Sequence, residues 1–140
     1  MHIALLFLSC LSLWAASPLE DIRRIYPNAV NDKSLCKESI EQLKKLDLTI
    51  AIHLGYLGGL QAIWANHVFS PISKLQTFNK GKENIELAIK KEPSNAELRY
   101  IRLSIQQHAP SFLGYKKNIK EDIDFLKQHK RQLTSPVVQD

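Results

Sequence analysis

The side chains best suited to chemistry are charged residues in the segments 97–106 and 121–124. Arg99 and Arg102 are three residues apart, so on a helix they are neighbours on one flank. Two adjacent guanidinium groups can clamp a carboxylate or another anion of a partner. They can instead form ion pairs inside the protein, with Glu86 or with an acid of 121–124. We favour these internal pairs, and Arg102 with Asp122 above the others. The predicted structural set is Glu86, Glu97, Arg99, Arg102 and Asp122.

Histidines and a cysteine raise the question of a metal or a nucleophile. Zinc ligands occur at short, repeated spacings, such as i and i+4 on one helix, and these residues have none. His53 and His67 would lie about 21 Å apart along one helix. Cys36 is expected to be a small buried residue. The other residues considered are His108 and His129. We therefore expect no metal, no cofactor and no catalytic residue, and a protein that is not an enzyme.

Composition indicates an ordinary globular protein rather than a nucleic-acid binder. The 140 residues are 44% hydrophobic and 24% charged, with a formal net charge of +5. Glycine and proline are few, and no segment alternates apolar and polar residues, which favours an all-α class. Basic residues concentrate in 116–131, where few aromatic residues accompany them. An acidic partner or peripheral contact with a membrane stays open.

The first 17 residues read as a secretory signal. An apolar run over 3–14 is too short to span a bilayer and precedes small residues. Cleavage after Ala16, cleavage after Ser17 and retention as an anchor all stay open, and acylation at Cys10 is the less favoured lipoprotein alternative. We expect a signal over 1–17, one helical domain over 18–131 and a flexible tail over 132–140.

Apolar periodicity and capping residues predict five to six helices in an antiparallel bundle. Ser17 and Ser70, each followed by proline, read as helix starts. Ser94 and Glu97 read as a capping box after the turn at Pro93. The segment 48–69 is apolar on nearly all sides, which favours a buried central helix over a membrane span. Its glycines, at 55, 58 and 59, predict close packing of a neighbouring helix.

Two further apolar groups are expected on the bundle. A helical stripe precedes the Pro93 turn, and an elbow follows Pro110. The stripe comprises Ile72, Leu75, Phe78, Ile85, Ala88 and Ile89, and the elbow comprises Phe112, Leu113 and Tyr115.

The turn over 88–97 resembles the boundary between two tetratricopeptide repeats, with an alanine five residues before a proline. The resemblance implies a short α-solenoid. Over 56–126 the chain also resembles small secreted bacterial helical proteins of no assigned activity. Its Phe-Asn-x-Gly, Glu-Pro-x-Asn-x-Glu-x-Arg-x-x-Arg and Ala-Pro-x-Phe-Leu-Gly-Tyr patterns carry that resemblance. It implies an architecture and an exported location, in the periplasm or cell envelope.

These observations predict a non-catalytic interaction or scaffold module of the bacterial envelope. Aromatic and arginine side chains commonly anchor interfaces. The candidate partner-binding residues are Tyr56, Trp64, Arg99, Arg102 and Tyr115. One alternative is an enzyme or small-ligand carrier with a pocket beside the glycine-rich helix. Another is a membrane-anchored accessory subunit.

Overall fold

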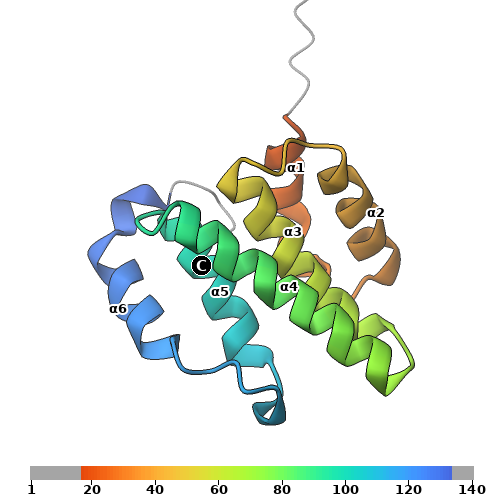
Figure 1. The fold of residues 1–140 in the computed structure, drawn as a ribbon. Helices are drawn as coiled ribbons and strands as arrows, with labels where there is room; N and C mark the ends of the chain where they lie inside the picture. The colour runs from red at the N-terminus through yellow and green to blue at the C-terminus, as the bar shows by residue number, and fades with distance from the viewer. Residues whose placement is uncertain (1–16, 134–140) are drawn as a thin grey trace, which may run out of the picture.

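A computed structural model describes residues 17–133, and this part of the chain is all-helical (Figure 1). Short 3₁₀ turns connect or follow several of the helices. The six α-helices are α1 (Pro18–Ile25), α2 (Lys33–Lys44), α3 (Ala51–Trp64), α4 (Pro71–Lys91), α5 (Ala96–His108) and α6 (Ile119–Gln128). The predicted all-α bundle is confirmed. The acylation prediction at Cys10 and all of the predicted signal except its last residue lie outside the described residues, as does most of the predicted tail.

Helix α3 is the central element, as its apolar sequence predicts. It packs against α2, α4 and α5, and most of its side chains are buried (Figure 1). It is shorter than predicted, because a 3₁₀ turn at Ala65–His67 ends it. Across the described part of the chain, no helix combines the length and the apolar character that crossing a bilayer requires.

Glycines bring the backbones of α3 and α4 into direct contact. A Cβ atom on Gly58 would lie 2.6 Å from the Gly81 carbonyl oxygen, and one on Gly81 would lie 2.5 Å from the Ala62 nitrogen. Backbone atoms cannot move aside as a flexible side chain can, so neither position has room for a larger residue. The predicted close approach at the glycines is confirmed.

Side-chain caps define where four of the helices start. Ser17 accepts from the Glu20 amide at the start of α1, and Ser70 accepts from the Ser73 amide at the start of α4. These two predicted starts are confirmed. Asp32 caps α2 through the Leu35 amide.

The predicted capping box at Ser94 is wrong. Asn95 is the N-cap of α5, and its side chain accepts from the Leu98 amide at 3.2 Å. The Glu97 carboxylate does not turn back to the cap, because Arg23 and Tyr56 bind it instead.

The apolar stripe of α4 is buried only from Phe78 onward. Ile72 is 71% exposed and Leu75 48% exposed, so the predicted burial of these first turns is wrong. In the predicted elbow, Tyr115 is buried and Leu113 packs on the core, but Phe112 is 85% exposed. Periodicity identified the apolar face of each segment but not whether a neighbouring element covers it.

Candidate functional site

Arg102 and Asp122, the pair preferred from the sequence, form the centre of a buried polar cluster between α5 and α6. Arg102 Nε donates to Asp122 Oδ2 at 2.8 Å, and Nη2 donates to Oδ1 at 2.6 Å. Gln106 Nε2 donates to Oδ2 at 3.0 Å, and Arg99 Nη1 lies 3.3 Å from Oδ1. The Asp122 side chain is fully buried. Its two carboxylate oxygens are therefore satisfied entirely by protein donors.

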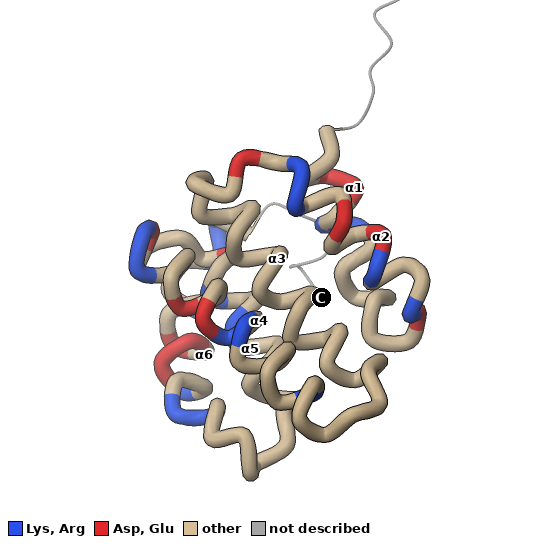
Figure 2. The backbone as a smooth tube through the Cα atoms, turned by 45° about the vertical axis from the view of Figure 1, so that its right-hand side comes forward, with Lys and Arg blue, Asp and Glu red and all other residues tan. Residues whose placement is uncertain are grey.

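The edge of this cluster holds further acids. Glu86 on α4 accepts from Arg102 Nη1 at 3.2 Å and from the Tyr115 hydroxyl at 2.7 Å. Glu121 accepts from Arg99 Nη1 at 2.7 Å. Figure 2 shows the acidic positions of α6 beside basic positions near α4 and α5. The cluster thus connects three helices through charge-assisted bonds.

Burial and neighbouring charges shift the pKa values of Arg102 and Tyr115 in this cluster. Desolvation disfavours the Arg102 cation, but the bonds to Asp122 and its charge outweigh this, and the Arg102 pKa is raised. Burial, followed by the bond to Glu86, raises the pKa of the Tyr115 hydroxyl. Arg102 therefore stays charged and Tyr115 stays protonated at neutral pH, so neither suits proton transfer there.

A second polar cluster joins α1, α3 and α5. Arg23 donates through Nε at 2.6 Å and Nη2 at 2.8 Å to the two carboxylate oxygens of Glu97. The Tyr56 hydroxyl donates to Glu97 Oε1. Arg23 was absent from the predicted set, because 74 residues separate it from Glu97 and no local pattern connects them.

Four of the five candidate partner-binding residues lie inside the domain. Tyr56, Arg99, Arg102 and Tyr115 are buried, with their polar groups bonded internally, so they are not accessible as an interface. Only Trp64 is partly exposed. The structure brings Arg99, Arg102 and Tyr115 together but places Tyr56 in the other cluster.

The metal and nucleophile candidates each have a local role. The described histidines, His53, His67, His108 and His129, each contact a backbone carbonyl through a ring nitrogen. Within residues 17–133, no three His, Cys, Asp or Glu side chains are grouped so that they could hold a metal ion. Cys36 is buried, and burial raises its thiol pKa to about 11. The thiol is therefore protonated at neutral pH, which disfavours a nucleophilic role.

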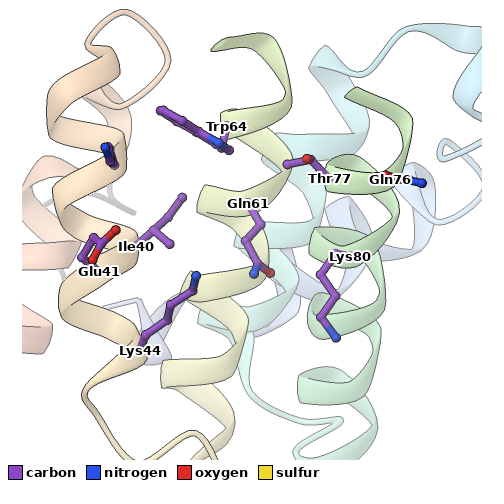
Figure 3. A pocket seen from close by; sticks show the side chains of 9 residues that line it. Ile40, Glu41, Lys44, Gln61, Trp64, Gln76, Thr77 and Lys80 are labelled. Carbon is purple, nitrogen blue, oxygen red and sulfur yellow. The ribbon is translucent and has the colours of Figure 1, made fainter. Parts of the chain in front are cut away.

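An open groove of about 360 Å³ lies between α2 and α4, with α3 as its floor (Figure 3). Trp64 extends from α3 toward α2 at one end, and the Gln61 side chain points into the groove. Asn84 Nδ2 donates to Gln61 Oε1 at 2.7 Å, which leaves the Gln61 NH₂ group as the end available to a ligand. The lining residues are Lys37, Ile40, Glu41, Lys44, Gln61, Trp64, Gln76, Thr77 and Lys80. Apart from Trp64, sequence analysis did not single out these residues, because three helices contribute them.

Large apolar side chains are exposed at one end of the bundle, which we call the apolar end: Phe69, Ile72, Leu75 and Phe112. The two phenylalanines are 92% and 85% exposed. The Phe78 and Tyr115 rings are 6.0 Å apart, so the loop that carries Phe112 approaches α4 one turn away from Leu75. In Figures 1 and 2 this loop and the start of α4 lie toward the same end of the molecule.

Comparisons with protein-family models, with curated proteins and with solved structures found no match.

Proposed function

We propose that the protein is an exported, non-catalytic interaction module of the bacterial envelope, and that it binds a protein partner through its apolar end. The observation that carries this proposal is the exposure of Phe69, Ile72, Leu75 and Phe112. Isolated exposed apolar residues are ordinary, whereas a group of large ones at one end typically belongs to an interface.

The energetics of the apolar end suit association. Burying a phenylalanine or leucine side chain that is otherwise in water contributes about 1.5–3 kcal/mol. The four side chains together can thus supply several kcal/mol to an interface, before the entropic cost of association. By contrast, the conspicuous arginines at 99 and 102 are bonded inside the domain.

Export and repeat-like architecture belong to the proposal on sequence grounds. The apolar run over 3–14 and the small residues after it support an N-terminal signal. The turn at 88–97 supports a tetratricopeptide-like helix pair, and α5 packs on α4 beyond that turn. Intact mass and cell fractionation test export. A mass short by 16 or 17 residues in the soluble envelope fraction is expected, and a full-length or acylated mass in the membrane fraction would favour the membrane-anchored accessory subunit.

Site-specific photo-cross-linking in the bacterial envelope tests the interface. We expect a photoreactive amino acid at position 69 or 112 to give the same discrete protein adduct, and one at exposed Lys90 to give none. A second Phe→Ser substitution within the apolar end should remove the adduct without changing the thermal unfolding midpoint. Adducts only with lipid, or equal adducts from position 90, would contradict a protein partner at the apolar end.

A further inference from the structure

The groove between α2 and α4 presents hydrogen-bond donors and positive charge. Lys37 and Lys44 come from the α2 wall and Lys80 from the α4 wall. Figure 3 shows Lys44 reaching from α2 toward α3, whereas Glu41, the one acid among the lining residues, stays against α2. Gln61 adds an NH₂ group from the floor, since its oxygen is bonded to Asn84.

The charges of these lysines are not used inside the domain. The arginines at 23, 99 and 102 all have carboxylate partners. Lys37, Lys44 and Lys80 form no ion pair with any residue in the range 17–133, and neither does Glu41. A groove that offers several ammonium groups and an amide donor is complementary to an acceptor-rich, anionic ligand.

The spacing of the lysines sets the form of that ligand. Lys37 and Lys44 are seven residues apart, so their positions on α2 differ by two turns, or about 10 Å along the helix. In a polyproline II conformation, which has three residues per turn and a rise of about 3.1 Å per residue, two acidic side chains three residues apart lie on the same side, about 9 Å apart.

Apolar surface in the groove favours a peptide over a simple polyanion. Trp64 closes one end, and Ile40 lies on the wall that carries the two α2 lysines. Lys33 Nζ lies 5.9 Å from the Trp64 ring centroid and 5.7 Å from that of Phe69, so basic and aromatic groups continue beyond the groove. An acidic segment with an apolar residue between its carboxylates would use both kinds of surface.

We propose that this groove binds an acidic peptide segment of a protein partner, with two carboxylates about 10 Å apart on the lysines and an apolar side chain against Trp64. The groove adjoins the apolar end at Phe69 but is not lined by Ile72, Leu75 or Phe112. Substitution at Phe112 therefore tests the two proposals separately.

A fluorescence titration tests the proposal directly. The full chain with Trp14→Phe retains Trp64 as its only tryptophan. The probe is a capped peptide with two glutamates three residues apart and a leucine between them, and the matched control has glutamine at both positions. We expect saturable changes in Trp64 emission with the acidic peptide, affinity that falls as salt is raised, and no response to the glutamine peptide.

Variants locate the binding and separate it from the proposed function. Lys37→Gln combined with Lys44→Gln, which removes the two lysines matched to the carboxylates, should weaken binding at least tenfold. Lys90→Gln on α4 and Phe112→Ser at the apolar end should leave it unchanged. Equal binding of the glutamine peptide, unchanged affinity in the double lysine variant, or no saturation would overturn the proposal. Acetate or inorganic phosphate matching the peptide in affinity would also overturn it, because the site would then recognise a small anion.

Discussion

The two sides of the central helices use positive charge in different ways. Where α5 meets α6, Arg99 and Arg102 are buried and bound to carboxylates. Where α2 faces α4, Lys37, Lys44 and Lys80 line an open groove without a carboxylate partner in the described part of the chain. The arginines therefore belong to the fold, and the lysines are the cations available for recognition.

The chemistry of the two cations fits this division. A guanidinium group presents several donors in a fixed plane, which allows the two-bond contact of Arg102 with Asp122. A lysine ammonium is a compact, strongly hydrated charge on a flexible stem, so it remains at the surface at little cost. In these two regions, the choice of arginine or lysine thus distinguishes a cation bonded inside the fold from one left at the surface, which the charge alone does not.

Loss of Asp122 is expected to have the largest effect on stability. Asp122→Ala leaves two buried guanidinium groups without their shared carboxylate, which should lower the unfolding free energy by about 3–5 kcal/mol. Urea denaturation followed by circular dichroism measures this. The matched control is Asp124→Ala, two residues away on α6, where the lost pair with Lys120 is exposed. The control should change stability by less than about 0.5 kcal/mol, and equal losses in both variants would show that the buried cluster does not hold α6.

Loss of the Glu97 charge should have an intermediate effect. Glu97→Gln weakens the two-bond contact with Arg23 and the Tyr56 bond, all partly buried, and should cost about 2 kcal/mol. The control is Glu20→Gln, because Glu20 pairs with the same arginine at the surface. Thermal or urea unfolding of both variants gives the comparison. A larger loss for Glu20→Gln would contradict the account of this cluster.

The smallest expected effect is the pH dependence of the stability that Glu121 contributes. The bond from Arg99, followed by that from Asn118, lowers the pKa of Glu121 in the folded protein. The unfolded chain therefore takes up this proton first, and the stabilisation by Glu121, present above its ordinary pKa near 4.5, is lost as pH falls. Because Glu121 is largely exposed, the effect should stay below about 1 kcal/mol. The stability gap between wild type and Glu121→Gln should shrink between pH 6 and pH 3, and a gap that widens would contradict this sign.

Local patterns predicted the helices well because their causes are local. Ser17 and Ser70 cap the helices that follow them, and the central apolar segment is buried. The glycine contact between α3 and α4 was also foreseeable, since buried glycines permit close helix packing. The Ser94 capping box failed because residues far away in the sequence, at 23 and 56, bind the carboxylate of Glu97.

The candidate site was less predictable, because it depends on which surfaces neighbouring elements cover. The sequence showed that Tyr56 and Tyr115 are amphipathic aromatics, but only the packing shows that both are buried. In the sequence, the lysines at 37 and 44 lie on an ordinary polar helix face. Only the packing of the helices shows that Lys80 on α4 lines the same groove. The ion pair of Arg102 with Asp122 could be proposed because both residues lie beside apolar stripes of neighbouring helices.

The most direct test of the difference between the buried arginines and the groove lysines compares two variants. Each replaces one cation with a flexible apolar side chain. In urea unfolding, Arg102→Met should lose about 3 kcal/mol or more, because it leaves Asp122 as a buried and poorly satisfied anion. Lys80→Met should remain within about 0.5 kcal/mol of wild type, because no described residue depends on its charge. Equal losses in the two variants, or a larger loss for Lys80→Met, would contradict the account.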